Sequence, residues 1–457
     1  MRAALCLIPL LIACAAKDAA PLDTAEPIGP RPAGDAAQGW EVLRYGGYVG
    51  GGVPKDLWFE YVGGSGANLL EREGDSARLS PGFNLFTTPE GVEVVGGVTC
   101  LGCHAGYVNG QFVPGLGNTF VDYTDDTSAF YDLLQALVDG RYGEDSPEHD
   151  AAERLVRGAN AVAPYIITPF AGVSPAFSIE RAVVTWRDPA TLEWLDEPIY
   201  EVPDTVPASD TPPWWHVKKK LSLYYNGMGL GDYARLIEQT GVVAIINAEH
   251  AEAIDQDFND VLAYLLSLEP PAYPEAIDAA LAADGQLVFE ASCAACHGTY
   301  SANAAEETYP GLRLDVTEVG TDPVYAEELA YAPFNEWLQA SWYGQGAWAA
   351  EFDAAMGYVA PPLDGVWATA PYLHNGSVPD LVALLDSSER PMLWSRSLSS
   401  ARWDFTRVGL PWEAETEATR VETYDTRQRG FANSGHTYGD DLSADERAAV
   451  LEYLKTL

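Results

Sequence analysis

Two short segments of the chain share one pattern of apolar and polar positions. Residues 261–268 (VLAYLLSL) and 450–457 (VLEYLKTL) both read V-L-x-Y-L-x-[ST]-L, with apolar positions at helical spacing. Ser443 and Glu446 form a capping box just before the second segment. The pattern predicts two amphipathic helices, each ending a domain, although two unrelated leucine-rich helices would look the same.

A third apolar pattern predicts a helix that runs up to Cys293. Its apolar positions are Ile277, Leu281, Leu287 and Phe289. The prolines of residues 269–276 (EPPAYPEA) end the preceding helix and mark a boundary. We therefore expect a first domain over residues 39–270 and a second over residues 275–457. The stretch FTTPEGVEVVGGV, before Cys100, is instead strand-like and rich in glycine, with no amphipathic helix.

The N-terminus has the pattern of an export signal. Arg2 precedes an apolar run, Ala3–Ala13, which is too short for a stable membrane span and ends at Cys14. We expect residues 1–14 to be a lipoprotein signal peptide with lipid on Cys14, and the protein to be a periplasmic or cell-surface lipoprotein. A plain secretory peptide is the alternative. Residues 15–38, rich in alanine and proline, predict a flexible tether.

The charge balance narrows the choice of partners. Across 457 residues, 67 Asp and Glu oppose 26 Lys and Arg, a net charge of −41. Such a surface repels nucleic acid and anionic lipid, so contact with a membrane is expected only through the lipid on Cys14. It would attract a basic partner protein, although a solvated, salt-tolerant surface is the simpler interpretation.

The cysteines point to a cofactor. Cys6 and Cys14 lie in the signal segment, and the other four form the repeated motifs CLGCH (residues 100–104) and CAACH (residues 293–297). Redox thiols would explain a CxxC pair but need no adjacent histidine. A zinc site could use both cysteines and the histidine, but an adjacent Cys and His are poorly placed to close one tetrahedron. Covalent haem attachment explains every element, because the thiols bind the porphyrin and the histidine ligates the iron. We expect two haem c groups, held by Cys100, Cys103, His104, Cys293, Cys296 and His297.

Each haem iron has a motif histidine on one face, and a second protein ligand on the other face would decide whether the iron can bind a small molecule. For the second haem, the loop that carries His436 is favoured as the source of the other ligand, ahead of Met356 and then His374. The first domain offers no convincing loop for such a ligand; its options are His149, His216, His250 and Met228. We therefore expect the first haem to be the open or weakly ligated one.

An aromatic cluster lies between the two motifs. Trp214, Trp215, Tyr224 and Tyr225 are close in sequence, either as core residues or with one tryptophan relaying an electron between the haems. Lysines 218–220 either face solvent or balance haem propionates.

The chain resembles the bacterial di-haem cytochrome c peroxidase superfamily, in particular the branch of the rubber oxygenases. The resemblance rests on both CxxCH motifs, on PPLDGVWATAPYLHNGSVPDL and on GFANSGHTYGDDLSADERAAVLEYLKTL. It implies a mainly α fold with irregular loops and a few short strands, in which two cytochrome c-like haem domains face each other. The helix before Cys293 resembles the opening helix of cytochromes c, in which Gly285 would permit close helix crossing.

The same resemblance implies a division of labour. His104 would serve the reactive haem, His297 and His436 would ligate the electron-transfer haem, and Trp214 or Trp215 would be the aromatic between them. Related peroxidases hold calcium between the domains, but no acidic constellation marks such a site here. We expect an oxidoreductase of peroxidase or oxygenase type, acting on peroxide or oxygen with an electron donor or acceptor protein. The alternatives are an electron-transfer cytochrome with both irons six-coordinate, and a haem-bearing sensor or scaffold.

Overall fold

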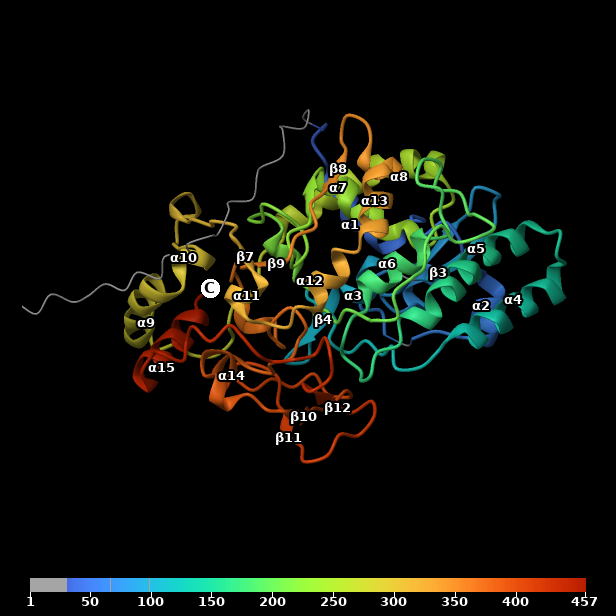
Figure 1. Ribbon diagram of the computed structural model, residues 1–457. Helices are drawn as coiled ribbons and strands as arrows, with labels where there is room; N and C mark the ends of the chain where they lie inside the picture. The colour runs from blue at the N-terminus through green and yellow to red at the C-terminus, as the bar shows by residue number, and fades with distance from the viewer. Residues whose placement is uncertain (1–30, 66, 98) are drawn as a thin grey trace, which may run out of the picture.

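The computed structural model describes residues 31–65, 67–97 and 99–457, and its fold is mixed (Figure 1). Helices contain 40% of the residues and strands 13%, and long irregular segments connect them. The strand content is therefore higher than expected for a mainly α fold with a few short strands. The expected signal peptide, Cys14 and most of the expected tether lie outside the described residues. No helix of the described part is both long enough and apolar enough to cross a bilayer.

The helices are α1 Ala36–Tyr45, α2 Lys55–Tyr61, α3 Cys100–Cys103, α4 Ser128–Tyr142, α5 Pro147–Val162, α6 Ala176–Val184, α7 Tyr233–Gln239, α8 Ala248–Ser267, α9 Ala279–Ser292, α10 Ala294–His297, α11 Val316–Val319, α12 Val324–Leu329, α13 Ala332–Ala340, α14 Leu381–Leu385 and α15 Ala444–Leu454. The strands are β1 Val53–Pro54, β2 Phe83–Thr87, β3 Glu93–Gly97, β4 Ala105–Val108, β5 Gln111–Pro114, β6 Gly229–Gly231, β7 Arg313–Asp315, β8 Ala350–Phe352, β9 Gly357–Val359, β10 Leu393–Ser395, β11 Glu413–Ala414 and β12 Thr423–Asp425. All strand pairs are antiparallel, in the orders β1-β3-β2, β11-β10-β12, β4-β5, β6-β8 and β7-β9.

Two helix pairs cross in the same way, each through a glycine. A Cβ on Gly285 of α9 would lie 1.9 Å from the carbonyl oxygen of Ala449 in α15. A Cβ on Gly39 of α1 would lie 2.0 Å from the carbonyl oxygen of Asp260 in α8. Ala449 and Asp260 each directly precede the V-L of the repeated pattern, so the two pairs are copies of one arrangement. The predicted capping box of α15 is also present.

The first copy has an opening helix that the sequence did not reveal. We expected none because the residues directly before Cys100 are strand-like, but α1 takes this role and residues 46–99 separate it from the motif. That insertion contains the β1-β3-β2 sheet, in which Phe83 pairs with Gly97 just before Cys100. Arg31 bonds to Asp232 at 2.7 Å, so the packed chain begins before residue 39, inside the expected tether.

The second opening helix buries Phe289 as its apolar pattern predicts, but Leu287 lies outside the buried face. In α9 the buried positions are Ala282, Gly285 and Phe289, whereas Leu287 is 67% exposed. Close approach to α15 requires small residues on the seam, which displaces the larger Leu287 to the outside.

The two expected domains interlock. β6, from the first, pairs with β8, from the second. One hydrophobic core joins Met228 and Val243 to Tyr325, Phe334 and Trp337. Figure 1 accordingly shows α13 and β8 beside α7, while α9 and α15 lie at the opposite side of the molecule from α4 and α5. The boundary between residues 270 and 275 stays a prediction.

The glycine crossings make a testable prediction. Gly285→Ala should lower the free energy of unfolding by about 2 to 3 kcal/mol, because the methyl group overlaps a backbone oxygen that cannot move freely. Denaturant unfolding of the cofactor-loaded protein would measure this. Gly140→Ala in α4 is the matched control: its Cβ meets nothing within 4 Å, so about 0.5 to 1 kcal/mol of added stability is expected there. Equal effects of the two substitutions would contradict the crossing.

Candidate cofactor sites

Both CxxCH motifs fold into a single helical turn. In α3 the N–H of His104 donates to the Cys100 carbonyl at 2.9 Å, and in α10 the N–H of His297 donates to the Cys293 carbonyl at 3.0 Å. One turn brings residues three apart to the same side of a helix, so the two cysteines of each motif lie on one side of the turn. This is the arrangement that attachment to one porphyrin edge requires.

The thiols lack the properties of redox cysteines. Burial raises the pKa of Cys100 to about 11 and that of Cys293 to about 11, and it also raises the pKa of Cys103. Reactive thiols have a lowered pKa, because the thiolate is the nucleophile. The four cysteines form no disulfide. Among the described residues, no group of three or more His, Cys, Asp and Glu converges as a metal ion would need.

A proline carbonyl lies near each motif histidine, but only His297 forms the hydrogen bond, and His104 Nδ1 is buried without a partner among the described residues. His297 Nδ1 lies 2.9 Å from the carbonyl oxygen of Pro361. A carbonyl only accepts, so this contact places the proton on Nδ1 and leaves Nε2 free to bind a metal. Burial lowers the pKa of His104 to about 4, and the carbonyl of Pro212 partly opposes that shift. Both imidazoles are therefore neutral at pH 7, the form that ligates iron.

These two prolines open copies of one loop, a repeat that the sequence analysis missed. Leu223 bridges Gly229 in the first copy, as Tyr372 bridges Val378 in the second. Tyr224 has φ 69° and Leu373 has φ 65°. Each copy continues with Asn-Gly, and its asparagine Oδ1 accepts from the N–H two residues on. An aspartate then caps the next helix, α7 or α14. The motifs LYYNG and YLHNG carried this signal in the sequence.

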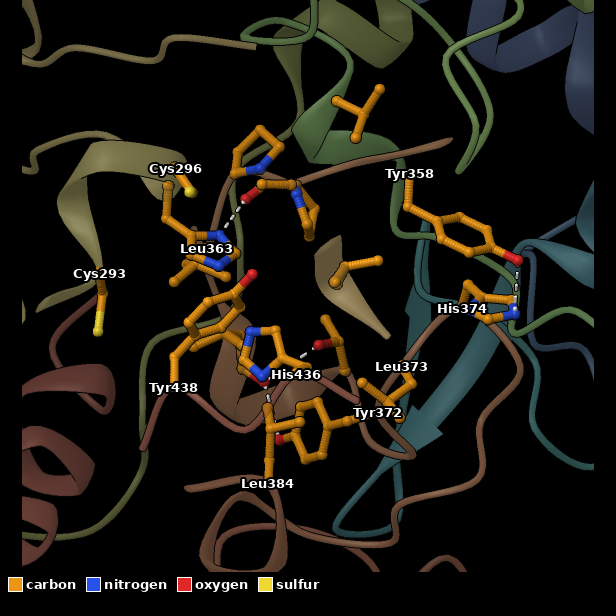
Figure 2. Close-up of a pocket in the computed structure, with 18 of the residues that line it drawn as sticks. Cys293, Cys296, Tyr358, Leu363, Tyr372, Leu373, His374, Leu384, His436 and Tyr438 are labelled. Atoms are coloured by element: carbon orange, nitrogen blue, oxygen red, sulfur yellow. Dashed lines mark hydrogen bonds between the residues drawn. The ribbon is translucent and has the colours of Figure 1, made fainter. Parts of the chain in front are cut away.

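A cavity of about 260 Å³ adjoins the second motif (Figure 2). Cys293, Cys296, His297, His374 and His436 all line it, within a mostly apolar wall. Figure 2 shows His436 in the middle of the lining, with the cysteines on one side and His374 with Tyr358 on the other.

His297 and His436 are spaced as ligands of one metal ion would be. Their ring centres are 6.2 Å apart. Two imidazoles bound to one metal at about 2.0 Å each would place their ring centres about 6 Å apart. Burial first, then the nearby His297 and Arg390, lower the pKa of His436 to about 3. His436 Nδ1 is buried without a hydrogen-bond partner among the described residues. The residues present therefore fit a haem iron between the two rings.

The loop that carries His436 is held rigidly. Arg390 donates to the carbonyls of Asn433, Gly435 and His436 at 2.7, 2.7 and 2.9 Å. The N–H of His436 donates to the Val319 carbonyl at 2.8 Å. His436 itself has φ 45°, an unusual value that this network maintains. Arg390 has no distinguishing mark in the local sequence, because its contacts with the His436 loop are made across the fold.

The rival ligands for the second site are placed differently. Met356 is 40% exposed and is not among the residues that line the cavity. His374 lines it, but its ring stacks on Tyr358 at 4.3 Å, and its Nε2 lies 3.2 Å from the Tyr358 hydroxyl. Of the three candidates, the structure brings His436 to His297.

The candidates around the first motif are engaged elsewhere. His149 Nδ1 lies 2.7 Å from Asp139, and His250 Nδ1 accepts from the Ile246 N–H at 3.3 Å. His216 Nε2 lies 2.8 Å from the Asp364 carbonyl, and Met228 is fully buried in a hydrophobic core. Relative to the shared V-L pattern, α8 begins about two turns earlier than α15. Helix thus occupies the stretch equivalent to residues 437–443, and the position equivalent to His436 is Asn247, the N-cap of α8.

The adjacent tryptophans belong to different cores. Trp214 stacks on His104, with ring centres 4.8 Å apart. Trp215 is 1% exposed and lies in the core of the second copy, where its Nε1 donates to the Asp364 carbonyl at 2.8 Å. Asp364 follows Pro361, the partner of His297, within one loop. The pair therefore connects the surroundings of the two motif histidines, whereas Tyr224 and Tyr225 pack against the core that the two domains share.

Comparison with known proteins finds a family match around the second site. Residues 357–395 match the family described as RoxA-like, cytochrome c-like. A cytochrome c-like domain implies covalently bound haem c, and the match supports a RoxA-related branch of c-type cytochromes. The matched segment includes both Pro361 and Arg390.

Two curated relatives are similar over part of their length. The uncharacterized protein y4iM of Sinorhizobium fredii is 29% identical over 302 residues, which cover 56% of this chain and 66% of that protein. The uncharacterized protein y4iJ of the same organism is 30% identical over 253 residues, 42% of this chain and 41% of that protein. The chain thus spans under two thirds of the length of either relative.

The His436 loop makes a prediction about Arg390. Arg390→Gln should release three backbone carbonyls and let His436 move away, so part of the haem at His297 should become high-spin in the ferric absorption spectrum. Arg427→Gln, which removes an exposed guanidinium paired with Asp425, is the matched control and should leave the spectrum unchanged. If the two spectra agree, Arg390 does not position His436.

Proposed function

We propose that the chain is an exported di-haem c-type cytochrome that acts as a peroxidase- or oxygenase-like oxidoreductase. The reactive haem would be attached at Cys100 and Cys103, and the electron-transfer haem at Cys293 and Cys296. One observation carries the proposal: the ring centres of His436 and His297 lie 6.2 Å apart, while the equivalent position of the first copy is Asn247, the N-cap of helix α8.

This asymmetry supports different roles for the two sites. An iron with imidazoles on both faces exchanges electrons, whereas an iron with one free face can also bind oxygen or peroxide. His297 and His436 would hold the first kind, with Arg390 and Pro361 orienting their rings. His104, kept neutral by burial, would be the protein ligand of the second kind.

Trp214 and Trp215 would couple the two sites. The stacked His104 and Trp214, the peptide bond to Trp215, and its hydrogen bond to Asp364 form a continuous path toward Pro361 and His297. Close contacts through aromatic rings and hydrogen bonds favour electron movement over gaps that only solvent fills. The tryptophans would thus deliver reducing equivalents to the reactive site.

The setting of the protein is part of the same proposal. Haem attachment to CxxCH motifs takes place outside the cytoplasm, which agrees with a signal peptide and a lipid on Cys14. The net charge of −41 would favour a basic electron donor or acceptor protein. The small oxidant would be peroxide or oxygen, and the lipid would provide the only contact with a membrane.

The first test measures how many haems are attached and how many of their irons can bind an external ligand. Protein from a host that matures c-type cytochromes should show the mass of two haems, and its reduced form should bind carbon monoxide at one of them. A mass without haem would end the proposal. Two haems that bind no carbon monoxide would instead favour the electron-transfer cytochrome with both irons six-coordinate.

The second test concerns the distal ligand. His436→Ala should convert the low-spin haem at His297 to high-spin and add a second carbon monoxide site, because an imidazole is lost from the iron. Met356→Ala, in an exposed side chain, is the control and should retain the wild-type spectrum. If Met356→Ala becomes high-spin and His436→Ala does not, Met356 would be the second ligand of the haem iron at His297.

The third test concerns the coupling path. Trp215→Phe keeps an aromatic ring but loses the hydrogen bond to Asp364, so electron equilibration between the haems should slow about tenfold or more. Rapid mixing of the half-reduced protein with carbon monoxide would measure the rate. Trp394→Phe removes a buried indole N–H that has no partner among the described residues, and it should leave the rate unchanged.

A further inference from the structure

Three consecutive lysines, residues 218–220, differ in what surrounds their ammonium groups. Lys218 Nζ lies 2.6 Å from Glu269, an exposed partner. Lys219 Nζ lies 2.6 Å from both Glu307 and Asp364. For Lys220, no carboxylate of the described residues lies within the 4.0 Å of an ion pair.

Lys220 faces the cavity of the second site. It lines the same space as Cys293, Cys296 and His436, and no other lysine or arginine of the described residues does so. Its backbone is fixed at both ends, since its N–H donates to the His216 carbonyl at 3.2 Å and its carbonyl accepts from the Tyr233 hydroxyl at 3.1 Å. The chain therefore directs this one cation into a mostly apolar space.

No carboxylate among the described lining residues forms an ion pair with Lys220. Burial alone lowers its pKa to about 8, with no carboxylate opposing the shift. Two acidic residues, Asp210 and Glu318, also line the cavity, and neither forms an ion pair with Lys220. Burial raises the pKa of Asp210 well above its usual value, which favours its uncharged form. An ammonium in such a wall is costly unless an anion joins it.

We propose that Lys220 pairs with a propionate carboxylate of the haem attached at Cys293 and Cys296. A haem c brings two carboxylates into its cavity, and a charge-assisted hydrogen bond to an ammonium is the partner that such a group needs. The inference rests on the second haem of the proposed function. It also assigns a cofactor contact across the fold, because Lys220 belongs to the first predicted domain.

The pairing has a consequence for electron transfer. A positive charge beside the propionate offsets negative charge near the iron and so favours the ferrous state, which carries one positive charge less. Lys220 therefore raises the reduction potential of the haem at His297. Without it, the uncompensated propionate favours the ferric state.

Redox titration of the low-spin haem tests the pairing. Lys220→Gln and Lys220→Met should shift the ferric-ferrous equilibrium toward ferric by tenfold or more, which is a potential lower by about 59 mV or more for one electron. Lys220→Arg, which keeps the charge, should stay near the wild-type potential. Lys218→Gln is the matched control: it removes the same charge from an ion pair whose carboxylate, on Glu269, is 75% exposed, so solvent screening should hold its shift below about threefold.

The outcomes separate this inference from the proposed function. If Lys220→Gln and Lys220→Met both carry haem and keep the wild-type potential, the pairing is overturned. The di-haem assignment would remain intact. A shift in Lys218→Gln as large as that in Lys220→Gln would also overturn it. If both neutral variants fail to retain haem while Lys220→Arg matures at the wild-type potential, the pairing is supported. Wild-type protein whose mass shows no haem would instead refute the proposed function itself.

Discussion

The hydrogen bond from His297 Nδ1 to the Pro361 carbonyl is the contact on which the second site depends. It sets the tautomer, the ring orientation and the nitrogen that faces the cavity. Because the carbonyl belongs to a loop that also carries Asp364, the same segment connects this imidazole to Trp215 and Lys219. Burial then keeps the ring neutral. One short backbone segment thus connects the candidate ligand His297 to the proposed path for electrons through Trp215.

The fold contains two copies of one arrangement of helices, motif and loop, and the copies differ at one point. Both copies have a glycine crossing between an opening and a closing helix, a one-turn CxxCH motif and a loop that begins with a proline near the motif histidine. The difference lies in the closing helix. α8 continues toward its N-terminus where α15 gives way to the His436 loop. Counted back from the shared V-L, the position of His436 corresponds to Asn247, the N-cap of α8, so the first copy has no imidazole at that position.

Contacts across the copies bind them into one body. β6 pairs with β8, Trp215 donates to Asp364, and Lys220 faces the cavity of the second motif. A scaffold in which each copy supplies groups to the other keeps the two cofactor sites at a fixed separation. Electron exchange between them would then need no domain movement. This is why the proposed coupling and the proposed propionate contact both depend on residues 212–220.

The sequence by itself determined the local chemistry. The CxxCH spacing places two thiols and an imidazole on one turn, and the V-L-x-Y-L repeat specifies two closing helices, because both depend on residues close together along the chain. It also placed His436 first among the candidate ligands. Only the tertiary structure decided which residues meet across the fold: the spacing of His436 from His297, the anchoring by Arg390, the distant opening helix α1 and the isolation of Lys220. These contacts join segments far apart in the chain, and a local sequence pattern does not determine which distant segments meet.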